Sequence, residues 1–514
     1  MQKRTIVLII LDGWGIGNLD ESNPIHVIEP ENIAFIKANY PAGALQASGI
    51  SVGLPWGEEG NSEVGHLNIG AGKTIYQHFP RITLAIRNES FFQNEPLKKA
   101  FDHAKKNAST VHFVGLLGSG NVHSSLEHLE ALIKFAGKEG AENYILHLFT
   151  DGRDSPPESA IQLLKKIPRD RLASLSGRFY AMDRDNHFER TERVYQVLVG
   201  DGPVIQDIEA HIKEAYAEHL NDEYVLPALI GPEKRFIKNN DAVIFFDFRE
   251  DRMRQIASPF VFAGFNKFNT KPLDNVYCVT MTQYDATFNV PVAFMPDIAK
   301  NPLGKVLSDR GLNQLRIAET QKYPHITYFF NGLREEPFKN EYRVLIPSKS
   351  LLRQDDHPEM MAPEITNRLI ESIEEGAYDF ILANYANPDM MAHTGNYQAC
   401  LDAIQITDKM MGRVVESCLK TNAVLIITSD HGNMERVFDP MTGKPETQHD
   451  PNPVPIYLVA SEFRLKEKKT PQAIKESEKI IVGILADVAP TILDLIGTPR
   501  PEEMTGQSLV KLLR

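Results

Sequence analysis

Short apolar runs that stop abruptly at polar clusters recur along this chain, and they limit its fold more than any other feature. The runs Ile6–Leu11, Tyr144–Phe149 and Val424–Thr428 each lead, within two residues, into a cluster rich in Asp, Gly or His. Runs of this length that are apolar on both faces are typical of buried parallel strands. Because ligands of open α/β sheets bind at the carboxyl ends of the strands, we expect the chemistry at these three ends.

Longer amphipathic stretches separate the apolar runs, and this alternation predicts an α/β fold with mostly parallel sheets. The predicted strands are Ile6–Leu11, Val111–Leu117, Tyr144–Phe149, Ala242–Phe246, Val276–Thr280, Arg343–Ile346, Phe380–Ala383, Val424–Thr428 and Pro455–Val459. The predicted helices are Ser125–Gly137, Ser155–Lys166, Ala362–Glu375, Tyr397–Lys420 and Ile480–Ile496.

Composition argues against several classes of protein. The chain has 55 basic and 68 acidic residues, a formal net charge of −13, which disfavours sequence-independent binding to nucleic acid. Its three cysteines form no C-x-x-C pair, which favours a reducing compartment. No apolar stretch approaches the ~20 residues of a membrane-spanning helix, and the first apolar run stops at Asp12 without a signal-peptide cleavage pattern. We therefore expect a cytoplasmic, enzyme-like protein with neither nucleic acid nor membrane as its partner.

Three carboxylates and three histidines, most of them at predicted strand ends, form a pattern that suits metal ions. Carboxylate and imidazole donors without thiolate favour a divalent ion such as Mn²⁺, Zn²⁺ or Co²⁺. One ion takes about four to six donors, so a set of this size predicts two ions. The residues are Asp12, Asp389, His393, Asp430, His431 and His449.

A glycine-rich stretch, Gly57–Gly72, contains the candidate nucleophile Ser62. In one interpretation, Asn61 or Ser62 simply caps a following helix, as such residues commonly do. In the other, the Ser62 hydroxyl ligates a metal ion at the positive end of that helix, and the ion lowers the pKa of the hydroxyl so that it becomes a nucleophile. The metal-ligand set favours the second interpretation.

The candidate ligands lie near both ends of the chain, which predicts an insertion. At 514 residues the chain has room for two large domains. We expect a metal-binding domain formed by residues 1–75 and 299–514, into which a second α/β domain, residues 76–298, is inserted. The turn-prone segments Lys73–Pro80 and Pro291–Pro302 would link the two domains.

Eight motifs, in order along the chain, match one family. They read LDGWGIG, GNSEVGHLNIGAG, LLGSGNVHS, TDGRDSPP, YAMDRD, IAETQKYPH, NPDMMAH and SDHGN, and His449 follows them. The chain thus closely resembles, nearly end to end, the 2,3-bisphosphoglycerate-independent (cofactor-independent) phosphoglycerate mutases of the alkaline-phosphatase superfamily. The resemblance implies an alkaline-phosphatase-like domain that carries an inserted α/β domain. It also implies the interconversion of 3-phosphoglycerate and 2-phosphoglycerate in glycolysis and gluconeogenesis, usually by a monomer.

The resemblance further implies a role for each site residue. One ion would be held by Asp389, His393 and His449, and the other by Asp12, Ser62, Asp430 and His431, with Ser62 as the phosphorylated nucleophile. The substrate phosphoglycerate would contact His123, Arg153, Asp154, Arg184, Arg190, Arg249, Arg252 and Lys322. The resemblance favours Mn²⁺ as the ion, with Mg²⁺, Co²⁺ or Zn²⁺ as alternatives.

These roles agree with the chemistry of the side chains. Guanidinium groups suit the phosphate and carboxylate of the substrate, and Lys322 could stabilise charge on the transferring phosphoryl group. Asp154 would carry protons to and from the substrate oxygens. It could instead form a turn or cap before Ser155, and spacing alone would allow Asp151 in its place, so only the motif selects Asp154. His123 is either structural or part of a phosphate-binding loop.

Transfer rather than hydrolysis requires that water be kept from the phosphoserine, so we expect the two domains to close over the substrate. A metal-dependent phosphatase or a mutase for another metabolite remains an alternative, and so does an inactive binding protein, against which the complete ligand set argues.

The family motifs change at Asp247, Glu250 and Asp450, and at Gly332-Leu333-Arg334. These changes leave the assigned reaction intact.

Overall fold

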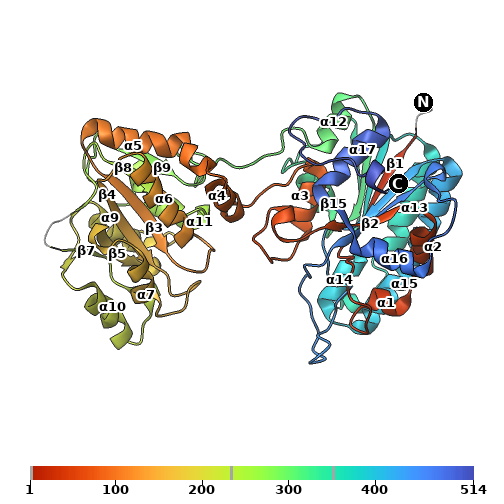
Figure 1. Cartoon of the computed structure of the whole chain (residues 1–514), viewed down its shortest axis with the longest axis horizontal. Helices are drawn as coiled ribbons and strands as arrows, with labels where there is room; N and C mark the ends of the chain where they lie inside the picture. The colour runs from red at the N-terminus through yellow and green to blue at the C-terminus, as the bar shows by residue number, and fades with distance from the viewer. Residues whose placement is uncertain (1–3, 232–234, 350–352, 514) are drawn as a thin grey trace. The chain divides into compact units, whose positions relative to one another are not determined.

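The computed structural model describes residues 4–231, 235–349 and 353–513. The chain divides into two compact units (Figure 1). Unit 1 consists of Met1–Gln77 and Asp297–Arg514, and unit 2 consists of His78–Pro296. Each unit has its own sheet and its own apolar cores, so the predicted α/β class is confirmed.

The sheet of unit 1 has eight strands among the described residues. All run in one direction except β14, which pairs antiparallel with both of its neighbours. In the register of the three central strands, Ile10 of β1 lies beside Asn384 of β12 and Thr428 of β13, so the residues that follow these strands meet at one edge. In spatial order the strands are β11 (Glu341–Ile346), β10 (Gln314–Glu319), β12 (Phe380–Tyr385), β1 (Ile6–Leu11), β13 (Val424–Thr428), β14 (Val454–Val459), β2 (Ala42–Gln46) and β15 (Ile481–Ile484).

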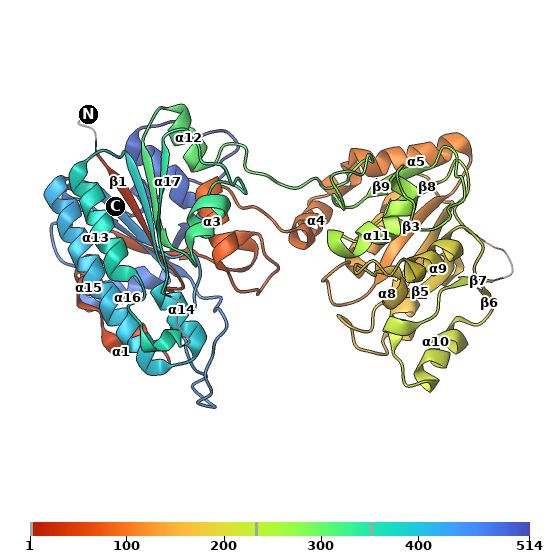
Figure 2. The ribbon, with the colours of Figure 1, turned by 180° about the vertical axis from the view of Figure 1, so that it is seen from behind.

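Helices cover both faces of this sheet (Figures 1 and 2). One face of β1, with Val7 and Ile9, packs in a core with α2 (Glu31–Asn39), α13 (Ala362–Glu375), α14 (Asn387–Thr394) and α15 (Tyr397–Thr421). The other face, with Leu8 and Ile10, packs in a core with α3 (Ser62–Ala71), α12 (Leu303–Asp309) and α17 (Val488–Ile496). Burial on both faces explains why β1 is apolar throughout. The remaining helices of unit 1 are α1 (Pro24–Ile28), α16 (Pro471–Lys479) and α18 (Val510–Leu513).

The sheet of unit 2 has seven strands among the described residues. Five of them run parallel, and β7 pairs antiparallel with β5. In spatial order the strands are β6 (Val204–Ile205), β7 (Ala228–Ile230), β5 (Leu172–Gly177), β4 (Tyr144–Thr150), β3 (Val111–Leu117), β8 (Ala242–Phe245) and β9 (Tyr277–Thr280). The helices are α4 (His78–Arg87), α5 (Glu95–Asn107), α6 (Leu126–Lys138), α7 (Ala160–Leu163), α8 (Arg178–Ala181), α9 (Phe188–Leu198), α10 (Ile208–Ala217) and α11 (Glu250–Val261).

Two of the predicted helices are wrong in part. The prediction over Ile480–Ile496 holds only from Val488, because residues 481–484 form β15, which pairs with β2 at the edge of the sheet. The predicted helix Ser155–Lys166 shortens to α7, Ala160–Leu163, with one 3₁₀ turn after it. The two prolines that follow Ser155 lack the N–H groups that an earlier helix interior would need.

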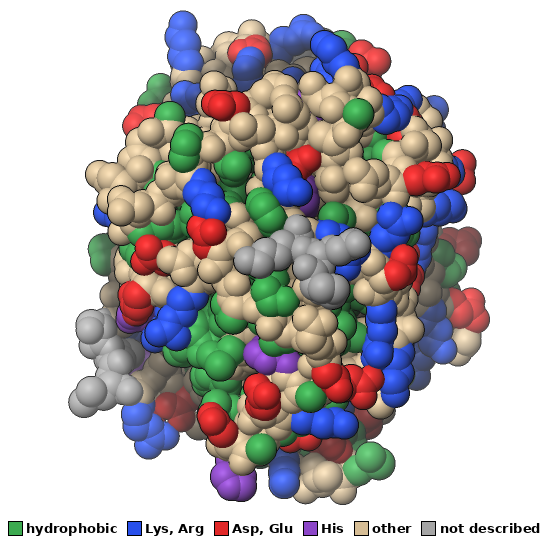
Figure 3. Space-filling view, turned by 90° about the vertical axis from the view of Figure 1, so that its left-hand side faces the viewer, with side chains coloured by type: hydrophobic (Ala, Val, Ile, Leu, Met, Phe, Trp, Pro, Cys, Tyr) green, Lys and Arg blue, Asp and Glu red, His purple; other side chains and the backbone are tan. Residues whose placement is uncertain are grey.

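The face of the molecule drawn in Figure 3 carries charges of both signs. On the face drawn in Figure 3, Lys and Arg side chains are interspersed with Asp and Glu side chains. Interspersed charges of opposite sign keep the long-range field of such a face small. Every helix of the described segments is too short or too polar to cross a membrane.

Candidate functional site

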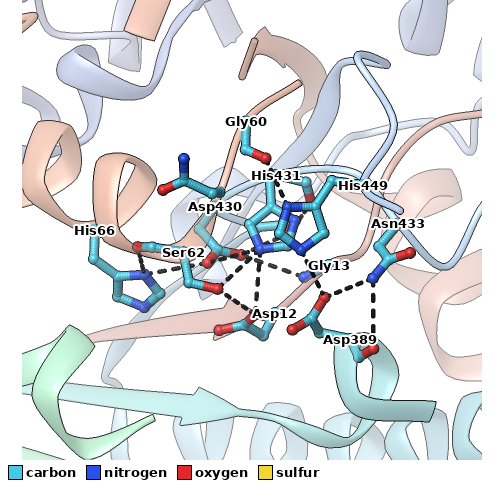
Figure 4. A network of polar contacts seen from close by, with 12 residues as sticks. Asp12, Gly13, Gly60, Ser62, His66, Asp389, Asp430, His431, Asn433 and His449 are labelled. Atoms are coloured by element: carbon cyan, nitrogen blue, oxygen red, sulfur yellow. Dashed lines mark hydrogen bonds and ion pairs between the residues drawn. The ribbon is translucent and has the colours of Figure 1, made fainter. Parts of the chain in front are cut away.

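Side chains from four segments of unit 1 meet at the carboxyl edge of its sheet (Figure 4). Asp12 follows β1, and Asp430 and His431 follow β13. Asp389 lies in the first turn of α14, and Ser62 is the first residue of α3. All five side chains are buried. The neighbouring register of β12, β1 and β13 brings the three loops together at the place where parallel sheets bind ligands.

Two groups of candidate metal ligands lie next to each other there. Within each group, the possible ligand atoms lie within 4.8 Å of one another. The groups adjoin because the rings of His431 and His449 stack with their centroids 3.9 Å apart. One group is Asp389, His393 and His449, and the other is Asp12, Asp430 and His431.

The Ser62 hydroxyl touches both groups through its neighbours. Its Oγ lies 3.2 Å from Oδ1 of Asp12 and 3.0 Å from Nε2 of His431. The Nζ of Lys322 donates to Ser62 Oγ at 2.8 Å and to Oδ2 of Asp389 at 2.7 Å. The lysine therefore connects the hydroxyl to the group formed by Asp389, His393 and His449.

The cap of α3 is made by the residue before Ser62. The side chain of Asn61 accepts a hydrogen bond from the N–H of Val64 at 3.0 Å. Asn61 thus caps the helix, as the first interpretation predicts, and the hydroxyl of Ser62 faces the candidate ligands (Figure 4). The positive end of a helix favours negative charge at this position.

The carboxylates of this site strongly stabilise positive charge. Burial by itself raises the pKa of a carboxyl, yet Lys322 and His393 hold the pKa of Asp389 well below its ordinary value. Burial would lower the pKa of Lys322, but Asp12 and Asp389 raise it above its ordinary value. Burial would likewise lower the pKa of His431, but the charge of Asp430 outweighs burial and raises that pKa to about 10.

The donor set fits divalent cations. Carboxylate, imidazole and hydroxyl donors without thiolate suit ions such as Mn²⁺, Mg²⁺, Co²⁺ or Zn²⁺. Oδ2 of Asp430 is buried and accepts no hydrogen bond from the described residues, and Nδ1 of His66, at 3.2 Å, faces it outside hydrogen-bond geometry. A buried carboxylate oxygen of this kind is costly unless a cation compensates it.

The proton-transfer candidate Asp154 and the predicted substrate contact His123 lie in unit 2, after the carboxyl ends of parallel strands. His123 follows β3 and Asp154 follows β4, and Nε2 of His123 lies 3.5 Å from Oδ2 of Asp154. Asp151, the alternative on spacing alone, is buried and accepts hydrogen bonds from the hydroxyl of Ser155 and the N–H of Asp154. The side chain of Asp154 is 20% exposed, so it is the one of the two that solvent and ligands can reach.

Four of the five predicted arginines of unit 2 pair with acids. Arg184 Nη1 lies 2.5 Å from one oxygen of Asp251, and Arg249 Nε lies 3.5 Å from the other. These two arginines are therefore brought together, each with about half of its side chain exposed.

The other three arginines have separate partners. Arg190 Nη1 lies 3.1 Å from Oδ2 of Asp183, and Arg153 Nη1 lies 3.8 Å from Oε1 of Glu223. Arg252 donates to a backbone carbonyl, and its Nε is buried with no hydrogen-bond partner among the described residues.

Two further polar residues at these sites were not predicted from the sequence. Asn384, at the end of β12, donates from Nδ2 to Oδ2 of Asp12 at 2.7 Å and lies 3.0 Å from Nε2 of His66. Arg178, at the end of β5, contacts both Asp151 and Asp154. Asn384 could have been found from its position at the end of the predicted strand Phe380–Ala383. In the structure it stands in register with Ile10, the second-last residue of the strand that precedes Asp12.

Comparisons with known proteins agree with this geometry. A family model described as the Metalloenzyme superfamily matches residues 4–500. A 2,3-bisphosphoglycerate-independent phosphoglycerate mutase of Clostridium novyi is 44% identical, and the match covers 99% of this chain and 100% of the relative. The enzyme of the same name from Ectopseudomonas mendocina is also 44% identical, with 99% of each chain covered. The chain belongs to the 2,3-bisphosphoglycerate-independent phosphoglycerate mutase family.

A solved structure supports the same family of phosphoglycerate mutases. The phosphoglycerate mutase of Leishmania mexicana, solved at low cobalt concentration, is 28% identical, and the match has a TM-score of 0.53. It covers 99% of this chain and 98% of that one. The predicted family, the α/β fold and the assignment as an enzyme of the isomerase class are therefore confirmed.

The residues that depart from the phosphoglycerate mutase motifs have definite places in the structure. Asp247 is fully buried at the end of β8 and accepts from the N–H of Leu116 at 2.8 Å. Glu250, in the first turn of α11, lies 2.6 Å from Nε2 of His78. Asp450 pairs at 3.7 Å with Arg436. None of the three displaces a predicted ligand or substrate-binding residue.

Proposed function

We propose that this chain interconverts 3-phosphoglycerate and 2-phosphoglycerate without added bisphosphoglycerate, through a phosphoserine on Ser62. The observation that carries the proposal is the surroundings of one oxygen. Ser62 Oγ lies within 3.2 Å of Asp12, His431 and Lys322, at the first residue of a helix and beside both groups of candidate metal ligands. A hydroxyl in such a place is suited to become a nucleophile for phosphoryl transfer.

Two divalent ions complete the proposed site, with Mn²⁺ as the first choice among Mn²⁺, Mg²⁺, Co²⁺ and Zn²⁺. When bound, the ions would stabilise charge on the phosphoryl oxygens and lower the pKa of the serine hydroxyl. Asp389, His393 and His449 would hold one ion, and Asp12, Ser62, Asp430 and His431 would hold the other.

The protein side chains then have distinct tasks. In the first half-reaction the Oγ–P bond to Ser62 forms, the ester bond to glycerate breaks, and Asp154 gives a proton to the departing oxygen. In the second half-reaction the other hydroxyl of glycerate attacks the phosphorus, the Oγ–P bond breaks and frees the Ser62 oxygen, and Asp154 takes up the proton of the attacking hydroxyl. Lys322, at 2.8 Å from Ser62 Oγ, stabilises the charge of the transferring group.

The substrate is retained between the two halves by the arginines of unit 2. Arg153, Arg184, Arg190, Arg249 and Arg252 offer planar guanidinium groups to its phosphate and carboxylate, and His123 adds an imidazole. Because Ser62 belongs to unit 1 and Asp154 to unit 2, both units must reach the same substrate during turnover. We expect closure on substrate binding, measured as a change in the distance between spin labels on the two units. A distance that stays constant would contradict it.

A coupled assay on chelator-treated protein tests the function. We expect 2-phosphoglycerate from 3-phosphoglycerate only after a divalent ion is added back, with bisphosphoglycerate omitted. Ser62→Ala should lower the rate at least about 10⁴-fold, and Ser461→Ala, an exposed serine of the same unit, should leave it unchanged. Release of free phosphate as the main product would identify a phosphatase instead.

We also propose that the protein acts in the cytoplasm as a monomer, with the small-molecule phosphoglycerate as its partner. Its three cysteines are free and buried, which suits a reducing compartment. Light scattering should give the mass of one chain, 57.8 kDa, and a dimer mass at working concentrations would contradict the proposal.

A further inference from the structure

A buried arginine stands behind the proposed proton carrier of unit 2. Arg178 follows β5 directly, and only 4% of its side chain is exposed, so the substrate cannot reach it. Its Nη1 donates to Oδ1 of Asp151 and to Oδ2 of Asp154, both at 2.5 Å. One guanidinium nitrogen thus joins a buried carboxylate to a partly exposed one.

Asp151 anchors this arrangement from below the surface. Its Oδ2 accepts from the hydroxyl of Ser155 at 2.6 Å, and its Oδ1 accepts from the N–H of Asp154 at 3.1 Å. Burial by itself would raise the pKa of Asp151, but the hydrogen bonds from Ser155 and Arg178 hold it below its ordinary value. Asp151 therefore stays charged and keeps both Arg178 and the turn that carries Asp154 in place.

The contacts of Asp154 select one of its oxygens. Arg178 and His123 both lie against Oδ2, at 2.5 Å and 3.5 Å. We propose that Arg178 is a positioning residue for proton transfer, and that it holds Oδ2 of Asp154 through both protonation states so that Oδ1 exchanges the proton with the substrate. This inference rests on the proposed role of Asp154 as the proton carrier.

The other charged groups around Arg178 agree with this role. His123 faces it from the end of β3, and burial together with the Arg178 charge lowers the pKa of His123 to about 4. His123 is thus neutral near pH 7 and does not compete with Arg178 for the Asp154 carboxylate. Asp247 after β8, Arg249 at the N-cap of α11, and Asp251 and Arg252 within α11 are further charged groups that act on this cluster.

The test measures kcat and KM of four variants. Arg178→Gln should lower kcat about 10–100-fold with KM within about twofold of the parent, because Arg178 is buried behind Asp154. Arg178→Lys keeps a cationic donor for Asp154 and should lose less of kcat than Arg178→Gln.

Arg171→Gln is the matched control, an arginine at the other end of β5 that contacts Asp170 and a backbone carbonyl. It should change neither kcat nor KM. Equal losses of kcat in Arg178→Gln and Arg178→Lys, together with lower thermal stability, would overturn the inference, because that result describes a purely structural arginine.

A double variant separates the two proposals. If Arg178 acts through Asp154, adding Arg178→Gln to Asp154→Asn should lower kcat no further, whereas independent effects would multiply. If Arg178→Gln does not fold, Arg178→Lys in the same two backgrounds carries the test, and multiplicative losses again overturn the inference. Full activity of Asp154→Asn would instead refute the proposed proton carrier itself, and an inactive parent protein would refute the proposed function.

Discussion

The candidate sites of the two units follow the same rule of topology but differ in charge and in burial. Both are assembled at the carboxyl ends of parallel strands. In unit 1 the carboxylates of Asp12, Asp389 and Asp430 are buried and share the ammonium group of Lys322. In unit 2 Arg153, Arg184 and Arg249 are about half-exposed, and each meets an acid near the surface.

This difference shows what each site has to do. A cation site holds several anionic donors close together, so the donors must be fixed in place and shielded from water. Their mutual repulsion lowers the stability of the fold unless a cation offsets it. A site that grips a small anion must release its arginines from their resting partners. Exposed ion pairs are worth only about 0–1 kcal/mol, so such partners are given up at little cost.

The largest expected effect follows from removing the buried ammonium group of Lys322 in unit 1. Lys322→Met should lower the free energy of unfolding of the metal-free protein by about 3–5 kcal/mol, because it leaves buried carboxylates without their partner. Mutase activity should be lost as well. Denaturant titration measures the first effect and the coupled assay the second.

Lys305→Met is the matched control for this change. Lys305 is an exposed lysine of the same unit, paired with Asp309 one helical turn away, and its loss should cost no more than about 0.5 kcal/mol. Equal losses of stability in the two variants would mean that the charges of the centre are not coupled to the fold. The contrast between the two units would then fail.

A smaller and opposite pattern is expected in unit 2. Arg184→Ala should raise KM for phosphoglycerate about 10–100-fold, while the free energy of unfolding changes by less than about 1 kcal/mol, because its ion pair with Asp251 is largely exposed. Steady-state kinetics and thermal unfolding on the same preparation check both parts. Arg193→Ala, an exposed arginine of the same unit outside the predicted set, should leave KM unchanged. A large loss of stability with an unchanged KM would reverse the roles assigned to the two units.

The last effect concerns Asp247, a buried carboxyl of unit 2 with no charged partner in hydrogen-bond contact among the described residues. Burial raises the pKa of Asp247 to about 8, so the folded chain keeps a proton that the unfolded chain releases near pH 4. The resulting stability is fully present below pH 4 and is lost as the pH rises through 8. Asp247→Asn imitates the protonated acid, so its stability should match that of the parent near pH 4 and exceed it by a growing margin as the pH rises towards 8.

Thermal unfolding across this pH range measures that difference. Asp274→Asn, at an exposed position of the same unit, should follow the parent at every pH. A parent protein whose stability does not decline between pH 5 and pH 8 relative to Asp247→Asn would show that the buried carboxyl is compensated in another way.

The sequence was sufficient to predict which residues meet at the candidate metal centre, because most of them follow strong strand signals. Asp12, Asp430 and His431 each follow an apolar run that could be read as a strand, and Asp389 and His393 share one helical turn. These are local patterns, and strand ends of one parallel sheet meet in space whatever their distance along the chain.

The rest could not be predicted because its signals are not local. Arg178 follows β5, whose residues Leu172–Gly177 include two serines and a glycine and lack an apolar signature, so neither the strand nor the arginine at its end was recognised. The segment before Val488 was assigned to a helix because its strand pairing with β2 depends on residues far away in the chain. The choice between Asp151 and Asp154 depends on burial, which only the folded chain defines.

The central claim is that Ser62 accepts the phosphoryl group at a centre of two divalent ions. Rapid quenching of the Mn²⁺-loaded protein during turnover of phosphoglycerate, followed by peptide mass spectrometry, tests it most directly. We predict one phosphoryl group on the peptide that contains Ser62, absent from the chelator-treated protein and from Ser62→Ala. Sustained turnover with no phosphoryl group on that serine, or with the group on another residue, would contradict the account.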